Sequence, residues 1–312
     1  MELWDYAELS PEELLARIKE AKERKGAVIL AHNYQRPEIQ QVADFLGDSL
    51  QLARKATEID ADIIVFCGVL FMAEVAAILN PDKKVLIPEI QAGCPLAACA
   101  AAEDVMALSR QHPDYAVVTY VNSSAEVKAV SDIVCTSANA VKVVSSLPPE
   151  KGVIFVPDKN LCRHAKKHTG RQNIICWDGN CYVHDRLSLA DLRRAQTEHP
   201  EATIIVHPEC PPEVQDAADL VFSTGGMYRY VKEHPGEPVV LGTEVGMVDR
   251  LRWEFPQTPV YPMSERAICA NMKLITLPKL ARSLEGEIYE VKVPESVARR
   301  AKRAIERMLE IK

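Results

Sequence analysis

Cysteines that follow strand-like segments are the residues best able to do chemistry in this sequence. The chain has 312 residues and nine cysteines, an odd number. Five of them lie in loop-like stretches: Cys94 and Cys99 in IPEIQAGCPLAAC, Cys176 and Cys181 in NIICWDGNCYVH and Cys269 in PMSERAICANMK. These stretches lack both the C-x-x-C spacing of a zinc ribbon and the closely spaced cysteines of a ferredoxin. The spacing alone therefore gives only a weak signal for a metal site.

The elements that must position these cysteines form a pattern that occurs three times. The regions begin at Gly26, Tyr115 and Ala202, each with a β-branched apolar run: AVILA, AVVTY or TIIV. Such runs are typical of strands buried on both faces of a parallel sheet. Two further strands are predicted in each region: ADIIVFC and KKVLIPEI, then SDIVC and GVIFVPD, then ADLVF and PVVLGTE. Helix starts lie between the strands, and this βαβ order predicts parallel sheets with helices on both faces.

The repeat predicts an α/β fold of three similar three-layer α/β/α units. Their predicted bounds are 1–108 with an N-terminal helix, 109–195, and 196–312 with a C-terminal helix. The terminal helices are expected in SPEELLARIKEAKERKG and ESVARRAKRAIERMLE, while GDSLQLARKATEID is expected to be an extra helix of the first unit. Ligands of parallel α/β sheets bind at the carboxyl ends of the strands. The polar tips HNYQ, VNSS, HPEC, CTSANA and STGGM are therefore expected to line one shared cavity.

One loop cysteine in each unit would place three thiolates around a common centre. Three thiolates suit a 4Fe–4S cluster that has one iron without a protein ligand, and an open metal position allows Lewis-acid catalysis. Cys94 follows Gly93, and Cys181 follows Gly179 and Asn180, in tight turns whose backbone N–H groups can stabilise sulfur. The alternative is that these thiols are buried or incidental.

Composition and charge limit the classes of partner and compartment. The net charge of −7 argues against nucleic acid as the main partner, which usually requires a basic face. The N-terminus has no basic segment followed by an apolar core, and no apolar run reaches membrane-spanning length, so a cytoplasmic protein with no membrane partner is expected. A disulfide framework is not expected in that reducing compartment, and Cys67 and Cys135 are expected to be buried apolar residues.

Ten motifs occur in an order that identifies a family. They are AHNYQ, GDSLQLA, FCGVLFMAE, AGCP, YVNSSAEVKA, CTSANA, WDGNCYVH, HPEC, STGGM and CANMK. Together they closely resemble the quinolinate synthase family, also called NadA, from about Val28 to about Leu277. The resemblance implies a pseudo-threefold arrangement of the three α/β/α units around a central 4Fe–4S cluster.

The resemblance also implies a reaction and a set of cluster ligands. Iminoaspartate and dihydroxyacetone phosphate would condense to quinolinate, with release of phosphate and two waters, in de novo NAD biosynthesis. The cluster would act as a Lewis acid in dehydration, and a functional link to an aspartate-oxidising enzyme that supplies iminoaspartate is expected. The cluster ligands match Cys94, Cys181 and Cys269. The stretch AGCPLAACA departs from the family pattern by its second cysteine, so Cys99 is a rival to Cys94.

The remaining cysteines would not be cluster ligands in this family. Whether Cys99, Cys176 or Cys210 forms a regulatory disulfide stays open at this point.

The substrates of that family require donors for two carboxylates and a phosphate. Residues that match carboxylate binders are His32, Ser49, Tyr120, Asn122, Ser137 and His184. Ser223 and Thr224 in STGGM, followed by two glycines, are expected to bind phosphate. For each Ser or Thr alone the alternative is helix capping.

Proton transfers in the condensation and the dehydrations need acid and base groups. Glu209 and His207 in HPEC are the strongest candidate pair, because residues two apart on a strand point to the same side. Tyr34 lies two residues after His32 at the corresponding place of the first region and is the third catalytic candidate.

Two other classes of protein are alternatives to this enzyme. A nucleotide-binding α/β protein would show a G-x-G-x-x-G or Walker pattern after a strand, and neither occurs. A non-catalytic iron–sulfur electron carrier or redox sensor would not need a cavity lined with carboxylate-binding and phosphate-binding groups. The enzyme is therefore the preferred interpretation.

Overall fold

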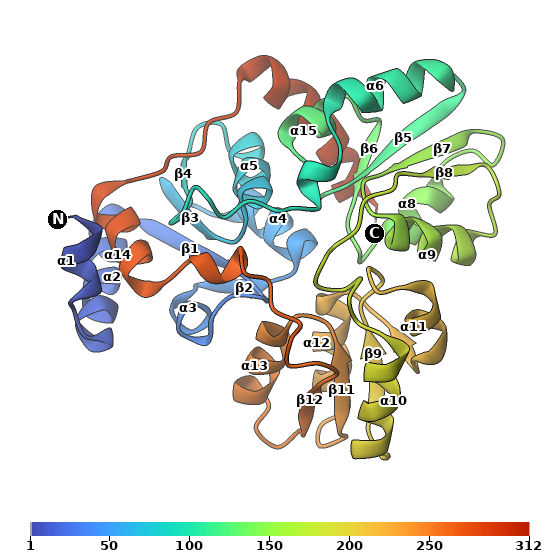
Figure 1. Cartoon of the computed structure of the whole chain (residues 1–312). Helices are drawn as coiled ribbons and strands as arrows, with labels where there is room; N and C mark the ends of the chain where they lie inside the picture. Colours follow the sequence, from blue (N-terminus) through green and yellow to red (C-terminus); the bar gives the residue numbers. More distant parts are fainter. Residues whose placement is uncertain (1, 312) are drawn as a thin grey trace. The chain divides into compact units, whose positions relative to one another are not determined.

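The fold consists of three parallel four-stranded sheets with helices on both faces, as a computed structural model that describes residues 2–311 shows (Figure 1). The strands of the first sheet are β1 (Ala27–His32), β2 (Phe45–Gly47), β3 (Ile63–Cys67) and β4 (Lys84–Leu86). Those of the second are β5 (Tyr115–Tyr120), β6 (Ile133–Cys135), β7 (Gly152–Val156) and β8 (Ile174–Cys176). Those of the third are β9 (Thr203–Val206), β10 (Leu220–Val221), β11 (Val239–Gly242) and β12 (Val260–Pro262).

The sheets share one topology. Their strand orders are β2-β1-β3-β4, β6-β5-β7-β8 and β10-β9-β11-β12. Each order places the first strand between the second and the third, with parallel pairing throughout. The predicted α/β class with three similar units is therefore confirmed, while the pseudo-threefold arrangement around a cavity stays a prediction.

The chain divides into two compact units. Unit 1 reaches from the N-terminus to Cys94 and continues from Cys269 to Ala298, and unit 2 contains Pro95–Ile268 and the residues from Arg299 onward. Unit 1 holds the first sheet, and unit 2 holds the second and third sheets. The predicted boundaries at 108/109 and 195/196 both fall inside unit 2, and they stay predictions.

The helices follow the same division. Unit 1 contains α1 (Leu3–Ala7), α2 (Pro11–Lys25), α3 (Pro37–Val42), α4 (Ser49–Glu58), α5 (Leu70–Leu79), the 3₁₀ turn η2 (Met272–Leu274) and α14 (Leu277–Gly286). Unit 2 contains the 3₁₀ turn η1 (Ala97–Cys99), α6 (Ala102–Gln111), α7 (Ala125–Ala129), α8 (Ala140–Ser146), α9 (Lys159–Thr169), α10 (Leu189–Glu198), α11 (Pro212–Ala217), α12 (Thr224–Glu233) and α13 (Val245–Glu254). The division between the units falls inside α15 (Glu295–Glu310). Among the described residues, no helix combines the length and the apolar character that a membrane crossing requires.

The N-terminal helix α2 confirms its sequence signals. The Ser10 hydroxyl accepts a hydrogen bond from the N–H of Glu13, and the Glu13 carboxylate accepts one from the N–H of Ser10, which satisfies two N–H groups at the helix start. Gly26 ends the helix in the left-handed conformation, with φ of 56°, where a residue without Cβ is favoured. The buried face of α2 packs with α14 over one face of the first sheet.

One aspartate in each sheet marks the same position of the repeat. The carboxylates of Asp44, Asp132 and Asp219 each accept a hydrogen bond of 2.8 Å from a backbone N–H of the first strand. Each aspartate directly precedes the second strand of its sheet. Asp44, and not the Asp62 of ADIIVFC, is thus the counterpart of the other two.

This equivalence corrects the strand assignment of the first region. ADIIVFC forms the third strand β3 and KKVLIPEI contains the fourth strand β4, so each sheet has four strands where the sequence predicted three. The strands that were missed are β2, β8 and β12, which have three residues each. GDSLQLARKATEID contains α4, which follows the second strand as α8 and α12 do, so it is no extra helix.

The cysteines at the strands show one predicted feature, burial, and one disulfide. Cys67 and Cys135 have no solvent exposure, and their burial raises the pKa of both thiols, so the prediction that they are buried apolar residues is confirmed. Cys162 on α9 and Cys176 on β8 form a disulfide, which the sequence left open for Cys176 and did not suggest for Cys162. Because α9 packs against β8, the two Cα atoms lie 5.7 Å apart, within the range that a disulfide spans.

His164 on α9 is expected to make stability depend on pH. Burial lowers its pKa to about 4, although the hydrogen bond between its Nδ1 and Gln215 Oε1, 2.8 Å apart, opposes that shift. The unfolded chain, with a pKa near about 6.5, then binds more protons than the folded chain between the two values. The free energy of unfolding should therefore fall as the pH is lowered from about 6.5 towards about 4, and this residue should contribute a loss of roughly 2 kcal/mol at about pH 5.

Chemical denaturation of the wild type and of His164→Gln, at neutral pH and at about pH 5, measures this contribution. The variant should lose less stability on acidification than the wild type, since glutamine does not titrate. Equal losses in the two proteins would show that His164 titrates alike in the folded and unfolded chains.

Candidate functional site

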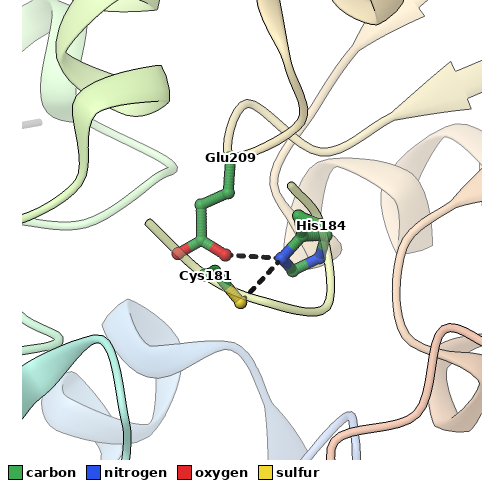
Figure 2. A group of neighbouring side chains, drawn as sticks. All are labelled: Cys181, His184 and Glu209. Atoms are coloured by element: carbon green, nitrogen blue, oxygen red, sulfur yellow. Dashed lines mark hydrogen bonds and ion pairs between the residues drawn. The ribbon is translucent and has the colours of Figure 1, made fainter. Parts of the chain in front are cut away.

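Two loops of unit 2 bring a thiol, an imidazole and a carboxylate together. Cys181 and His184 lie in the connection from β8 to α10, and Glu209 lies in the connection from β9 to α11. Figure 2 shows the three side chains pointing toward one another. His184 Nδ1 lies 2.6 Å from Glu209 Oε2 and 3.3 Å from Cys181 Sγ. His184 and Glu209 are buried and Cys181 is partly buried, so this group can exchange protons or bind a cation away from bulk water.

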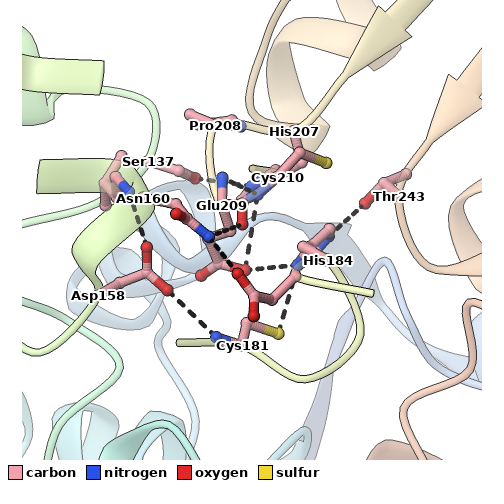
Figure 3. Close-up of polar contacts among 12 residues, drawn as sticks. Ser137, Asp158, Asn160, Cys181, His184, His207, Pro208, Glu209, Cys210 and Thr243 are labelled. Atoms are coloured by element: carbon pink, nitrogen blue, oxygen red, sulfur yellow. Dashed lines mark hydrogen bonds and ion pairs between the residues drawn. The ribbon is translucent and has the colours of Figure 1, made fainter. Parts of the chain in front are cut away.

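The imidazole of His184 is held on its other side. Its Nε2 lies 2.9 Å from Thr243 Oγ1, and its ring stacks on that of His207 with centroids 4.4 Å apart (Figure 3). His207 in turn has its Nε2 3.2 Å from Ser137 Oγ. These contacts join the strand ends of the second and third sheets in one polar network.

The loop of Cys181 is fixed by hydrogen bonds of its backbone N–H groups to residues just after β7. Asp158 caps α9 by accepting a hydrogen bond from the N–H of Leu161, and its other carboxylate oxygen accepts one of 3.2 Å from the N–H of Cys181. The N–H of Gly179 donates to the carbonyl of Pro157 at 3.0 Å. A Cβ at position 179 would lie 2.5 Å from that carbonyl oxygen, so only glycine fits this close approach.

The charges of the site are set by burial and by neighbours. Burial alone would raise the pKa of Glu209, but the interactions with His184 and His207, and a smaller one with Tyr120, lower it below its usual range. Burial, followed by the negative charge of Glu209, raises the pKa of Asp158. The pKa values of the two carboxyl groups thus differ, and Glu209 is the one that is ionised. Such a difference between two neighbouring groups is expected where one acts as an acid and the other as a base.

Two buried acceptor atoms, one in this group and one on a predicted binding residue, have no hydrogen bond from the described residues. They are Oε1 of Glu209 and Oδ1 of Asn122. A buried acceptor without a donor costs about 1–3 kcal/mol. Both atoms are therefore suited to accept a bond from a ligand.

The structure brings several predicted residues of unit 2 together. Tyr120, at the end of β5, is buried and close enough to Glu209 to affect its pKa. Ser137, in the loop before α8, contacts His207. Ser223 and Thr224 are buried at the start of α12, where Ser223 Oγ accepts a hydrogen bond from the N–H of Gly226. That bond is the capping role that was the alternative to phosphate binding.

The predicted residues of unit 1 show the same local geometry at the end of β1. The N–H of Tyr34 donates to His32 Nδ1 at 3.1 Å, as the N–H of Glu209 donates to His207 Nδ1 at 3.3 Å. The rings of His32 and Tyr34 meet edge to face, with centroids 4.6 Å apart. Ser49 is the first residue of α4. The roles of these residues in binding and catalysis stay predictions.

Four residues of the network were missed by the sequence analysis. They are Asp158, Asn160, Asp185 and Thr243. The Asn160 amide donates to Asp185 Oδ1 at 2.7 Å and to the backbone carbonyl of Glu209 at 3.0 Å. Asp158 and Thr243 closely follow the third strands β7 and β11, so the polar tips of third strands were the signal that could have found them.

Comparison with known proteins decides the family. The sequence pattern of the family described as "NadA: Quinolinate synthetase A protein" matches residues 16–310. The chain belongs to the quinolinate synthase family. The quinolinate synthase of Methanoregula boonei is 51% identical over 296 residues, which cover 95% of this chain and 97% of that protein. That of Pyrococcus horikoshii is 51% identical over 300 residues, with 96% and 99% covered. That of Methanothermobacter thermautotrophicus is 52% identical over 292 residues, with 93% and 95% covered.

The cysteines of this quinolinate synthase family member differ in their capacity to bind a cluster. Cys67, Cys135 and Cys210 are fully buried, and desolvation raises the pKa of each thiol, which disfavours the thiolate that metals bind. Cys162 and Cys176 form the disulfide. The four that remain are Cys94, Cys181 and Cys269, which are partly buried, and Cys99, which is exposed.

The three ligands implied by the family are thus among the four cysteines that fit a cluster. Cys99 fits less well than the others, because its exposed Sγ contacts the carbonyl of Pro95 at 3.4 Å, while its own carbonyl accepts a hydrogen bond from the Trp177 indole at 2.9 Å. These contacts of Cys99 favour Cys94 as the cluster ligand of this loop.

Proposed function

We propose that this protein condenses iminoaspartate with dihydroxyacetone phosphate to give quinolinate, phosphate and two waters, in de novo NAD biosynthesis. The observation that carries the proposal is the buried group of Glu209, His184 and Cys181 in a chain about half identical to quinolinate synthases. The group combines a base, a proton carrier and a metal ligand, which would serve the proton transfers and the Lewis-acid step of the proposed dehydrating condensation.

Cys94, Cys181 and Cys269 would hold the 4Fe–4S cluster. When bound, the cluster supplies a Lewis-acidic iron that makes hydroxide a better leaving group in dehydration. Cys181 is the ligand whose surroundings are described most fully, since Asp158 holds its N–H and His184 lies beside its sulfur.

Glu209 and His184 would move the protons of the reaction. Glu209 is ionised and buried, so its Oε2 can accept a proton that a substrate carbon or nitrogen releases. At 2.6 Å from Oε2, His184 Nδ1 can share that proton, and Thr243 keeps the ring in place at Nε2. His207 completes the group by its stacking on His184, and Tyr34 is the proposed catalytic residue of unit 1.

Substrate binding is assigned to the polar tips of the strands. Asn122 Oδ1 is a buried acceptor that receives no hydrogen bond from residues 2–311, and it suits the nitrogen of iminoaspartate. The proposed carboxylate-binding residues are His32, Ser49, Tyr120, Asn122, Ser137 and His184. The proposed phosphate-binding residues are Ser223 and Thr224, since the start of α12 directs N–H groups and a partial positive charge outward.

Iminoaspartate hydrolyses in water, so an aspartate-oxidising enzyme must supply it close to the site of use. We place such an enzyme as the functional neighbour of this protein.

An assay of anaerobically purified protein tests the proposed function. The protein, mixed with iminoaspartate and dihydroxyacetone phosphate, is expected to form quinolinate, which chromatography detects. Free quinolinate is also expected to change the visible spectrum of the cluster. An iron–sulfur electron carrier, the second candidate, would be coloured but would form no quinolinate and would not respond to it.

A further inference from the structure

We propose that unit 2 contains a site for one divalent metal ion of the Zn²⁺ class, bound by Cys181, His184 and Glu209 when the cluster is absent. All three ligands belong to unit 2, whereas Cys94 and Cys269, proposed for the cluster, belong to unit 1. The mononuclear site therefore needs one unit, and the cluster needs residues of both.

The ligand atoms have the spacing of a tetrahedral site. Cys181 Sγ, His184 Nδ1 and a Glu209 carboxylate oxygen all lie within 4.8 Å of one another. Metal–ligand bonds of about 2.0–2.3 Å at tetrahedral angles place such atoms about 3.3–3.7 Å apart. The Nδ1 to Sγ distance of 3.3 Å already has this value. The Nδ1 to Oε2 distance of 2.6 Å is a hydrogen bond, so a metal ion would replace the shared proton and widen this pair by about 1 Å.

The surroundings orient each ligand as in known metal sites. Metal-binding histidines usually anchor their second nitrogen on a polar group, and His184 Nε2 is anchored on Thr243 Oγ1. The loop of Cys181 is fixed through its N–H by Asp158, and the loop of Glu209 is fixed through its carbonyl by the amide of Asn160. The three ligands are thus held in place by contacts that do not involve the metal.

Charge and desolvation also favour a cation of charge two. Glu209 is buried, its carboxylate would bring one negative charge to a bound metal, and its Oε1 accepts no hydrogen bond from the described residues. A metal-bound Cys181 thiolate would add a second negative charge, which balances a divalent ion. The mixed sulfur, nitrogen and oxygen set suits Zn²⁺ and Co²⁺ better than Mg²⁺ or Ca²⁺, which prefer oxygen alone. Three protein ligands leave one position for water.

Cys181 cannot serve both centres at once. A divalent ion in unit 2 would therefore have to leave before Cys181 joins the cluster, and Zn²⁺ should compete with cluster assembly. This consequence rests on the proposed function, but the metal site itself does not.

Co²⁺ titration of the full-length variant Cys94→Ser/Cys269→Ser tests the proposal. This variant retains all three ligands of the mononuclear site and lacks two of the three proposed for the cluster. One equivalent of Co²⁺ is expected to give a sulfur-to-cobalt charge-transfer band and intense visible bands of tetrahedral cobalt. Excess Zn²⁺ should abolish both.

Further substitutions in that variant separate this site from other thiols. Adding Cys181→Ser should remove the charge-transfer band, and adding His184→Gln or Glu209→Gln should weaken Co²⁺ binding at least about 10-fold. Adding Cys99→Ser, the matched control, should change nothing. The proposal is overturned if the band survives Cys181→Ser, or if the parent variant binds no Co²⁺ with sulfur coordination. Neither result would bear on quinolinate formation by the wild type, which the anaerobic assay measures independently.

Discussion

Glu209→Gln is expected to lower the turnover number for quinolinate formation by about 100-fold or more while the cluster is retained. Glutamine keeps the shape of the side chain and can still hydrogen-bond His184, but it cannot accept the proton that Oε2 takes. The ionised state of Glu209, set by His184 and His207 against the effect of burial, is lost with the substitution. Steady-state kinetics under anaerobic conditions, with iron and sulfide content measured on the same sample, gives both values.

Glu213→Gln is the matched control for this prediction. Glu213 is exposed on α11, four positions beyond Glu209, and has no role in the site. Its substitution should leave turnover within about twofold of the wild type, as is usual for exposed positions away from such features. Near-normal turnover of Glu209→Gln would remove this residue from the proton transfers. Thermal unfolding of both variants checks that the exchange of a buried carboxylate has not unfolded unit 2.

Single replacement of Cys94, Cys181 or Cys269 by serine is expected to abolish the visible iron–sulfur absorbance and quinolinate formation together. Each thiolate would bind one iron, and a serine hydroxyl is a poor substitute for a soft sulfur ligand. The chain should remain folded, because none of the three is in the disulfide or fully buried. Absorbance, iron content and activity of each anaerobically reconstituted variant are the measurements.

Cys99→Ser decides between the two cysteines of AGCPLAAC. It should keep cluster and activity, because Cys99 is exposed and its contacts are with Pro95 and Trp177. Loss of the cluster in Cys99→Ser with retention in Cys94→Ser would exchange their roles. Retention in all four variants would contradict the cluster assignment altogether.

The repeat could be predicted from the sequence because the first strand of each sheet is largely buried. AVILA, AVVTY and TIIV form β1, β5 and β9, the inner strands that pair on both sides. Burial on two faces requires uninterrupted apolar residues, which a sequence shows directly. The edge strands β2, β8 and β12 have three residues each, and their pairing depends on the inner strands. Length alone does not separate them from β4, β6 and β10, which have three residues or fewer and were predicted. The sequence does not record the pairing that adds a fourth strand to each sheet.

The register of the repeat was misread for a related reason. An acid before an apolar run occurs at both Asp44 and Asp62, and the longer run follows Asp62. Only Asp44 bonds the backbone of the first strand in the manner of Asp132 and Asp219. That long-range bond, across fifteen positions, distinguishes the two acids, and the sequence alone does not record it.

Site residues that directly follow the first or second strand of a sheet could be predicted from the sequence. Those that follow the third or fourth strand were harder to predict. Glu209, His207 and Ser137 were predicted from their place after such strands, and the structure brings them into one network. His184 was chosen by its place after Cys181, but its anchor Thr243 lies 59 positions away. The disulfide between Cys162 and Cys176 likewise depends on the packing of α9 against β8.

Quinolinate formation by anaerobically purified wild-type protein tests the central claim most directly. Iminoaspartate and dihydroxyacetone phosphate should disappear together, and quinolinate and phosphate should form in equal amounts, only in samples that contain the cluster. A sample with full iron and sulfide content that forms neither product would contradict the proposed reaction. Equal turnover by iron-free protein would contradict the role of the cluster.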